Sequence, residues 1–330
     1  ESLYSKAKKI IVEELEEQIL KDGAHYELSP MYHQIILDRV LDCISLVKDN
    51  PWKKNLELLS LMKLKATEML SWLIEVTFKD DIIPMVNDSA FGIAPSTSSL
   101  VKYGEGLKIF PRKTQLSDSG YRKFTSNSYE LFVDVGEVGP TYQPGHAHAD
   151  TFSFILKTGK SIIVDTGVST YNMGKVREEE RSTRYHNTVT VNDENSSKVW
   201  AGFRVANRAN VTIEHDRKSE LVASHNGYMS KGIKHTRSFR TDVSEIIVND
   251  FIDRDIEAQA HFHFHPDCKI KVNLSKNQVK IDDISITFNG SNGLQQNTYQ
   301  YAQGYNNKLD ADKITVTFRN SLETKIKIEG

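Results

Sequence analysis

The sequence lacks several features that would place a protein in a class at once. Its 330 residues include only two cysteines, Cys43 and Cys268, whose separation fits neither a metal site nor a redox pair. It has no apolar run near the roughly 20 residues that a membrane-spanning helix needs. It also lacks the phosphate loop GxxxxGK followed by Ser or Thr, the nucleophile elbow GxSxG and the zinc-protease motif HExxH. These absences weigh against P-loop nucleotide hydrolysis, α/β-hydrolase chemistry and zinc-protease chemistry.

A charge excess of one sign is also missing. The chain has 42 Lys and Arg against 44 Asp and Glu, which gives a formal net charge of −2 at pH 7, and the two signs are mixed throughout. This balance provides neither the basic stripe that binds nucleic acid nor the polybasic patch that binds a membrane surface. We therefore expect no nucleic-acid partner and no membrane span. No signal peptide is visible, but the chain opens without Met inside a helical pattern, so the compartment stays open.

The first third of the chain has the periodicity of amphipathic helices, with apolar residues three and four positions apart. Gly23 ends the first helical pattern, and Ser29 followed by Pro30 opens the second. Ser29 is the expected N-cap, and Pro30 fits the first helical position because its missing N–H is not needed there. A shorter helix is expected after Ser96. The three longer helical patterns predict stacked helical hairpins, and they cover residues 2–20, 30–47 and 51–78.

From about Tyr121 the pattern changes to short alternating strands. Segments such as YRKFT, ELFVDVG, SIIVDTG, ISITFNG, KITVTF and KIKIE are separated by Gly, Asn and Asp. Regular short strands of this kind predict an antiparallel β-sandwich. The predicted fold class is therefore a multidomain α+β protein. Its expected parts are a helical domain over residues 1–95, a linker with a short helix over 96–117 and an antiparallel β-sandwich over 118–330.

Two ionisable side chains are expected in the first turn of the second helix. Tyr32 and His33 follow the loop KDGAHYELSP. A helix N-terminus is partly positive and has unpaired N–H groups, so it suits anions and can draw the pKa of a phenol toward a useful range. From this stretch alone, a Tyr–His pair that only packs and hydrogen-bonds at an interface is the favoured interpretation.

The segment GHAHAD, residues 145–150, stands directly before the apolar run TFSFIL. In an extended segment residues i and i+2 share a face, so His146 and His148 are expected on one side. Asp165 ends one predicted strand and His186 opens another, so both can meet the histidine before a third strand. Two imidazole nitrogens and a carboxylate oxygen suit zinc, with one position left open. Two solvated loop histidines are the alternative.

Two further sets of residues are weaker candidates. Arg184, in the segment EEERSTRYHN, can hold anionic substrate groups, whereas Arg181 is expected to pair with the glutamates just before it. His261, His263 and His265 share one face of a predicted strand and could form a second metal site. No carboxylate or thiolate partner is evident for them. A half-buried strand with a solvated or hydrogen-bonded polar face is therefore the favoured interpretation.

Taken together, these segments resemble the heparinase II/III-like polysaccharide lyases. The resemblance is carried, in this order, by EELEEQILKDGAHYELSPMYH, NDSAFGIAP, GEVGPTYQPGHAHADTFSFIL, IIVDTGVSTY and RSTRYHNTVTVND, between about residues 14 and 193. It implies an α/α toroid fused to a β-sandwich, with a glycan bound between them. Three helices are too few for a toroid. The resemblance thus implies that this chain is the C-terminal portion of a longer protein, with only the end of the toroid.

The resemblance also implies roles for individual residues. Tyr32 matches the family's acid or base, His33 its active-site neighbour, and His146 the histidine that reaches the substrate from the sandwich. The implied ligands of a structural divalent metal, zinc in some members, are His148, Asp165 and His186. Weaker candidates for substrate binding are Arg184, Tyr171 and His25.

The function expected from the resemblance is cleavage of a uronate-containing polysaccharide by β-elimination. That reaction needs neutralisation of the uronate carboxylate, a base for the C5 proton and an acid for the leaving oxygen. Tyr32 and His146 are expected to face each other across an interdomain cleft, close enough to flank one sugar ring. The Asn or His that neutralises the carboxylate in the family lies upstream of this chain. We therefore expect the chain to have little activity of its own.

Other aspects of function stay open in the sequence. The expected partner is an anionic polysaccharide or oligosaccharide, and the resemblance favours a bacterial periplasm or cell envelope. One alternative is a non-catalytic glycan-binding or polysaccharide-assembly module. Another is a glycan hydrolase whose His/Asp/His metal site activates water.

Overall fold

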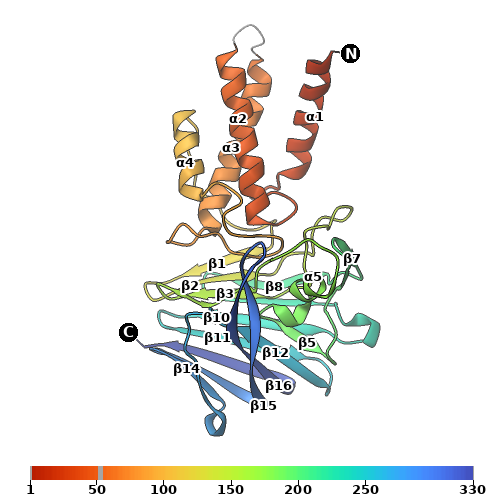
Figure 1. The fold of residues 1–330 in the computed structure, drawn as a ribbon, viewed down its shortest axis with the longest axis vertical. Helices are drawn as coiled ribbons and strands as arrows, with labels where there is room; N and C mark the ends of the chain where they lie inside the picture. The colour runs from red at the N-terminus through yellow and green to blue at the C-terminus, as the bar shows by residue number, and fades with distance from the viewer. Residues whose placement is uncertain (1, 51–54, 330) are drawn as a thin grey trace.

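The computed structural model describes residues 2–50 and 55–329, which form a helical domain stacked on a β-sandwich (Figure 1). The helices α1 and α3 run toward the sandwich and α2 runs away from it, so the N-terminus of α2 lies at the junction (Figure 1). No helix in the described ranges is long and apolar enough to cross a membrane. The helices are α1 (Leu3–Gln18), α2 (Pro30–Asp49), α3 (Leu56–Val76), α4 (Thr97–Gly106) and α5 (Lys175–Glu180).

The start of α2 follows from its sequence as predicted. Ser29 is the N-cap, its hydroxyl accepts a hydrogen bond from the N–H of Tyr32 at 3.3 Å, and Pro30 lies in the first turn. Ser96 caps α4 in the same way. The start expected for the third helix at Pro51 lies outside the described residues. The part that is described begins after the N-cap Asn55.

The strands form a small sheet and a large one, and all the strand pairs in the described part of the chain are antiparallel. The small sheet has the order β1-β2-β3-β4, and the large sheet runs β13-β14-β15-β16-β11-β10-β9-β8, with β12 paired to both β16 and β5. A separate hairpin joins β6 to β7. The strands are β1 (Tyr121–Thr125), β2 (Glu130–Asp134), β3 (Phe154–Lys157), β4 (Ser161–Ile163), β5 (Val189–Val191), β6 (Lys198–Trp200), β7 (Arg204–Ala206), β8 (Val211–Arg217), β9 (Glu220–His225), β10 (His235–Thr241), β11 (Glu245–Ile252), β12 (Glu257–His263), β13 (Lys271–Asn273), β14 (Gln278–Ile281), β15 (Ile284–Gly304) and β16 (Asn307–Ile328).

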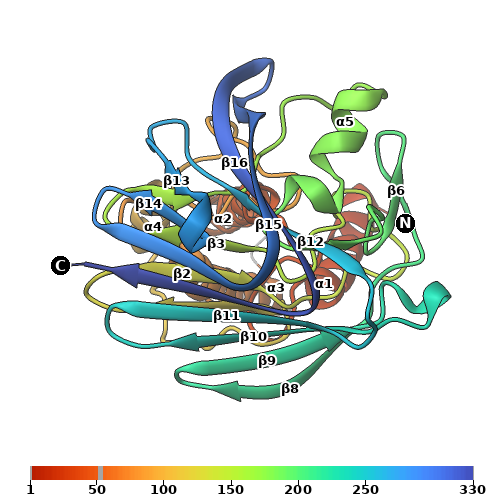
Figure 2. The same cartoon turned by 90° about the horizontal axis from the view of Figure 1, so that it is seen from below.

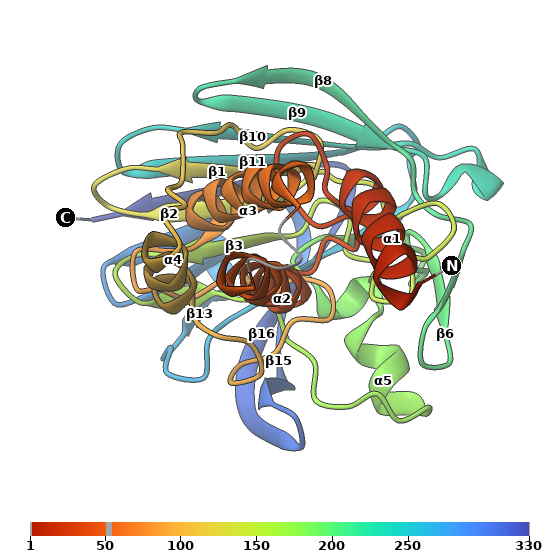
Figure 3. The ribbon, with the colours of Figure 1, turned by 90° about the horizontal axis from the view of Figure 1, so that it is seen from above.

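The small sheet is the middle layer of three. Leu131 and Val133 of β2 pack into the core between the two sheets, whereas Phe132 between them packs into the core of the helical domain. Ile155 of β3 also packs on the helical side. Successive side chains of a strand point to opposite faces of the sheet, so these strands have apolar side chains on both faces. Figure 3 shows α2 and α3 lying over this sheet.

The last two strands differ from the prediction. The sequence predicted several short strands here, but β15 has 21 residues and β16 has 22, and they form one long hairpin (Figure 2). Register shifts between Asn289 and Ser291 and between Ser291 and Gly293 bend the ladder without ending it. Gly290, with φ +88°, supplies the backbone conformation at this bend. The prediction of separate short strands was therefore wrong, because a bulge was taken for a turn.

Candidate functional site

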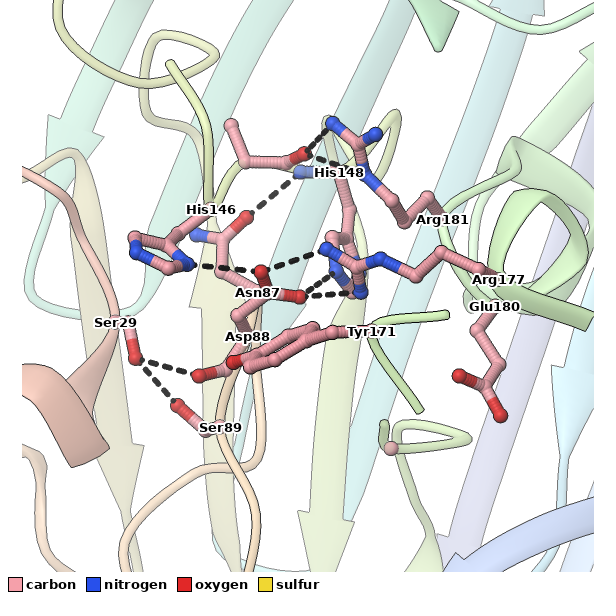
Figure 4. A network of polar contacts seen from close by, with 12 residues as sticks. Ser29, Asn87, Asp88, Ser89, His146, His148, Tyr171, Arg177, Glu180 and Arg181 are labelled. Carbon is pink, nitrogen blue, oxygen red and sulfur yellow. Dashed lines mark hydrogen bonds and ion pairs between the residues drawn. The ribbon is translucent and has the colours of Figure 1, made fainter. Parts of the chain in front are cut away.

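Segments far apart in the sequence meet where the helical domain rests on the sandwich (Figure 4). One is the N-terminus of α2, which carries Tyr32. A second is the loop NDSAF after α3, which carries Asp88. The others are the segment with His146 and His148 and the loop with Tyr171.

Asp88 lies at the centre of this network. Its carboxylate contacts Nδ1 of His146 at 2.9 Å and Nε2 of His148 at 2.9 Å. The guanidinium of Arg177 donates to both of its oxygens, at 2.5 and 2.7 Å. Burial alone would raise the pKa of Asp88, but hydrogen bonds from His146, His148 and Arg177 hold it well below the usual range. Asp88 is therefore an ionised carboxylate that is fully buried and fully paired.

This arrangement fixes the tautomer of His146. An ionised carboxylate only accepts hydrogen bonds, so the Nδ1 atom that faces Asp88 carries hydrogen. In the neutral imidazole, Nε2 is then the atom with a free lone pair. That nitrogen lies 3.9 Å from a carboxyl oxygen of Glu27, and the His146 side chain is 20% exposed. The geometry therefore presents His146 as a proton acceptor.

Tyr32 and His146 come together, but not as expected. Their ring centroids are 4.1 Å apart with an interplanar angle of 32°, so the rings touch. A sugar ring does not fit between two rings in contact, and the expectation that they flank one sugar was wrong. The cap at Ser29 places the first turn of α2 directly on the His146 segment.

The phenols in this group keep their protons. Burial raises the pKa of Tyr32, and the nearby charges of Asp88 and Glu27 raise it further. The expected lowering by the helix N-terminus is outweighed. Burial likewise raises the pKa of Tyr171 far above its usual value. The two hydroxyls are 3.1 Å apart, so Tyr171 can donate to a Tyr32 oxygen that has lost its proton.

The structure places His33 and His25 inside the helical domain. The ring of His33 is fully buried, contacts the Met69 carbonyl at 3.0 Å and accepts from the N–H of His25 at 3.1 Å. Burial lowers the pKa of His33 to about 3 and that of His25 to about 4. Nε2 of His25 contacts Gln18 at 3.1 Å. In this position the two histidines hold the loop before α2 and present no surface to a substrate.

Beneath the site lies a group of possible metal ligands. One ligand atom each of His148, Asp150 and His186 lies within 4.8 Å of the other two, and all three residues are buried. Nδ1 of His148, Oδ2 of Asp150 and Nε2 of His186 are buried without a hydrogen-bond partner. Buried polar atoms are rarely left unpaired. Two nitrogens and one carboxylate oxygen fit zinc with one position open.

Asp165, which was predicted as the third ligand, is not a member of this group of ligand atoms. Its carboxylate contacts Nδ1 of His186 at 2.8 Å, as Asp88 contacts Nε2 of His148. Metal-binding histidines usually give their other N–H to a carboxylate in this way. The structure therefore brings Asp165 beside the predicted trio as the partner of His186, and it adds Asp150, which the sequence analysis had not singled out.

The contacts of Arg181 and Arg184 differ from those expected from the sequence. Arg181 was expected to pair with glutamates, but it is fully buried and donates to the carbonyls of Ala147 and Gly202. Arg184 pairs with Asp193 at 2.6 Å and lines a groove of about 820 Å³ formed by residues away from Tyr32. The expectation for Arg181 was therefore wrong, and Arg184 is not brought to the Tyr32 group.

The histidines of β12 support the favoured interpretation. His261 contacts the Thr190 hydroxyl at 2.9 Å, and Nδ1 of His263 contacts the Asn187 side chain at 3.2 Å. Both rings are buried, and burial lowers the pKa of His261 to about 3. They act as hydrogen-bonded residues of the sheet, and the group of ligands that the described residues bring together lies at His186.

Several residues of the site escaped sequence reasoning. Asp88 lies in NDSAFGIAP, a segment that carried the resemblance, yet nothing in its spacing marked it as the centre of a network. Arg177 lies directly before three glutamates, and no sequence pattern indicated its contact with Asp88. Phe203 comes from a segment with no recognised pattern, and its ring lies 5.9 Å from His146. The segment NDSAFGIAP pointed to the neighbourhood of Asp88, whereas no sequence pattern indicated Arg177 or Phe203.

Comparisons with known proteins agree with one another. Residues 111–329 match the family described as "Heparinase II/III-like, C-terminal", and residues 2–117 match "Heparinase II/III N-terminus". The chain is similar to a heparin-sulfate lyase of Pedobacter heparinus, with 26% identity over 211 residues. That match covers 55% of this chain and 31% of the lyase.

The fold is similar to solved lyases. A mutant heparan sulfate lyase of Pedobacter heparinus matches with a TM-score of 0.78 at 18% identity, over 98% of this chain and 56% of that chain. A heparinase III matches with a TM-score of 0.76 at 16% identity, over 98% of this chain and 55% of that chain. The predicted fold class, helices followed by an antiparallel β-sandwich, is confirmed. The chain spans about half the length of these structures.

Proposed function

The chain belongs to the heparinase II/III-like family, and we propose that it is the C-terminal half of a lyase that cleaves a uronate-containing polysaccharide by β-elimination. The observation that carries the proposal is the pairing of a proton acceptor with a proton donor in ring contact. His146 is held by Asp88 with Nε2 free, and Tyr32 keeps its proton because burial raises its pKa.

In the proposed reaction His146 is the base. Nε2 takes the C5 proton of the uronate, and the imidazolium that forms is stabilised by the ionised carboxylate of Asp88. The electron pair of the broken C–H bond forms the C4–C5 double bond, and the bond from C4 to the leaving oxygen breaks. A positioned base of this kind contributes about 10²–10⁴-fold to the rate.

Tyr32 is the proposed acid. It donates its proton to the leaving oxygen, and the Tyr171 hydroxyl, 3.1 Å away, stabilises the phenolate by donating to it. Because Tyr32 and His146 are in ring contact, the proton on His146 has a short path back to Tyr32. One sugar bond is cleaved in each cycle, and no water is consumed.

The uronate carboxylate must be neutralised by another group. Arg177 is engaged with Asp88, and Arg181 donates to backbone carbonyls, so neither guanidinium is available for it. We propose that the portion of the protein upstream of this chain supplies the neutralising side chain and completes the toroid. The isolated chain then has little activity of its own.

We propose a structural divalent metal, zinc by its ligands, held by His148, His186 and the carboxylate of Asp150. Asp165 supports His186 as its hydrogen-bond partner. When bound, the ion supplies a positive charge that fixes the loops of the sandwich beneath the site. This chain's own residues carry the proton transfers.

The test is a product assay on the full-length protein. Heparan sulfate is the first glycan to try, because similar proteins are named as its lyases, followed by other uronate glycans. We expect a product with near-ultraviolet absorption from the unsaturated uronate, and we expect His146→Ala to abolish it. New reducing ends without that absorption would indicate a hydrolase. Binding without any product would indicate a glycan-binding module.

A further inference from the structure

Phe203 presents an aromatic ring to solvent beside the proposed base. Its ring centroid lies 5.9 Å from that of His146 at an interplanar angle of 82°, and 5.4 Å from that of Tyr171. Phe203 nevertheless remains 47% exposed. A single exposed hydrophobic side chain on a protein surface is ordinary. What distinguishes Phe203 is its place at the candidate site and the way in which its backbone is held.

The turn that carries this ring, residues 201–203 between β6 and β7, is held by two buried arginines. The carbonyl of Gly202 accepts from Nε of Arg177 at 3.0 Å and from the guanidinium of Arg181 at 3.2 Å. Both arginine side chains are fully buried. Ala201 has φ +50°, in the left-handed region that is uncommon for a residue with a Cβ. The arginines stabilise the turn in this conformation, so the position of Phe203 is set before a ligand arrives.

Arg177 holds this turn and the proposed base at the same time. Its guanidinium donates to both oxygens of Asp88, whose carboxylate contacts His146 (Figure 4). Its Nε donates to the Gly202 carbonyl, and its guanidinium carbon lies over the Phe203 ring, 5.6 Å from the centroid. One buried side chain therefore fixes the base and the exposed ring relative to each other. The part of the ring that Arg177 leaves uncovered is open to a ligand.

We propose that Phe203 binds substrate, and that the sugar ring bonded to the cleaved uronate stacks on it. The inference rests on the proposed lyase function, because that function places the uronate at His146, beside this ring. One face of a pyranose carries mainly C–H groups, and these hydrogens are attracted to the negative face of an aromatic ring. A ring that is already fixed binds the sugar with little loss of conformational entropy. Stacking recognises the shape of the sugar and not its charge, so it complements the neutralisation of the uronate carboxylate.

The substitution Phe203→Ala tests the proposal, because it removes the ring but no group that transfers a proton. With heparan sulfate and the full-length protein, we expect KM to rise about tenfold, the effect of one stacking contact, and kcat to stay within about threefold. Phe203→Tyr keeps an aromatic face, so its KM should stay within about twofold of the wild type. The matched control is Phe251→Ala on β11. The Phe251 side chain is 49% exposed outside the candidate site, and we expect its removal to leave KM unchanged.

A second measurement needs no turnover. In the Tyr32→Phe variant labelled with fluorinated phenylalanine, the Phe203 resonance, assigned with Phe203→Leu, should shift when a heparan sulfate hexasaccharide is added, and the Phe251 resonance should not. A Phe203 resonance that does not move, or a rise in KM no larger in Phe203→Ala than in Phe251→Ala, would overturn the stacking role. If the wild type formed no unsaturated product, the lyase function would be refuted, whereas a shifted Phe203 resonance would still establish that this ring binds the glycan.

Discussion

At the scale of single residues, one carboxylate organises the candidate site. Asp88 takes hydrogen bonds from His146, His148 and Arg177, and it is fully buried. A buried carboxylate without partners would be strongly destabilising, so these three side chains stabilise it as it fixes them. His146 and His148 are two positions apart, and each takes one oxygen of Asp88. The proposed base and a proposed metal ligand are thus held by one group.

Asp88→Asn should therefore damage both activity and stability. The amide keeps the shape of the carboxylate but turns one acceptor into a donor, which faces an N–H group. We expect kcat to fall by about 10²-fold, as for a base displaced by about 1 Å. We expect the free energy of unfolding to fall by about 3–5 kcal/mol, as for a broken buried ion pair. Turnover of heparan sulfate and urea unfolding measure the two effects.

A surface carboxylate is the control for this substitution. Asp216 accepts from Nε of Arg122 at 2.7 Å, and its side chain is 31% exposed. Asp216→Asn should leave kcat unchanged and lower the free energy of unfolding by less than about 1 kcal/mol. If the two substitutions had similar effects, Asp88 would not have the central place that we give it.

Tyr32→Phe tests the proposed acid. The ring and its contact with His146 remain, and only the proton is lost. We expect kcat to fall by about 10²-fold or more with a modest change in KM, because the lost interaction belongs to the transition state. Steady-state kinetics on the full-length protein measure this. Turnover near that of the wild type would remove the phenol from the mechanism and leave His146 as the group to examine.

The metal content of two variants distinguishes the roles of the two carboxylates near His186, Asp150 and Asp165. Asp150 is a member of the ligand group, whereas Asp165 contacts His186 at 2.8 Å. We expect Asp150→Asn to lose most of the bound zinc, and Asp165→Asn to retain it with affinity lowered about 10–100-fold, as for an outer-shell partner. Elemental analysis and chelator competition measure this. The reverse order of the two variants would make Asp165 the ligand, as the family resemblance implies.

At the scale of elements, a buried ion pair joins β10 to β11 and makes stability depend on pH. Asp250 of β11 accepts from Arg237 and contacts His235, both of β10, at 2.7 Å. Burial alone would raise the pKa of Asp250, but the Arg237 charge and the hydrogen bonds lower it to about 2. The unfolded chain has an Asp pKa near 3.9. Because the folded value is the lower one, this stabilisation is present above about pH 4 and is lost as the pH falls toward 2.

Acid unfolding of an Asp250 variant measures that contribution. A difference of about two pKa units corresponds to roughly 2–3 kcal/mol, so the contribution of Asp250 to the free energy of unfolding should fall by about that amount between about pH 5 and pH 1. Asp250→Asn lowers the stability at neutral pH, and the part of the pH dependence that belongs to this residue disappears. Unfolding curves at a series of pH values test it. If the stability of the variant had the same pH dependence as that of the wild type, other carboxyl groups would be responsible for the loss of stability in acid.

Local features were predictable from the sequence, and long-range ones were not. Ser29 and Pro30 set the start of α2 by chemistry within one turn, and the alternation of polar and apolar residues revealed the strands. The bond from Arg177 to Asp88 joins residues 89 positions apart, and no local pattern records it. Tyr305, in the turn between β15 and β16, lies beside Tyr171 with ring centroids 5.3 Å apart, and it does so only because the two strands continue through their register shifts. Residues that depend on tertiary pairing therefore escaped the analysis.

At the scale of the whole molecule, the small sheet couples the two domains. Its strands β2 and β3 are too short to be stable alone, and their apolar side chains point both ways. Phe132 packs with Tyr121 at 4.9 Å between ring centroids on the helical side. Phe154 packs with Phe239 at 5.8 Å on the side of the large sheet. The helices pack on the small sheet, and the small sheet packs on the large sheet. The candidate site depends on both of these interfaces.

This order of layers predicts an asymmetry between two similar substitutions. Phe132→Ala and Phe154→Ala each remove a fully buried ring from an adjacent strand, at a cost of about 3–5 kcal/mol. Phe132→Ala should lower the melting temperature of the helical domain and leave that of the sandwich nearly unchanged, so calorimetry should show two transitions. Phe154→Ala should lower both, because helices cannot remain on a sheet that has unfolded. In the first variant activity should be lost with the helical transition, since Tyr32 then leaves His146. A single transition lowered equally by both substitutions would mean that the two domains unfold as one unit.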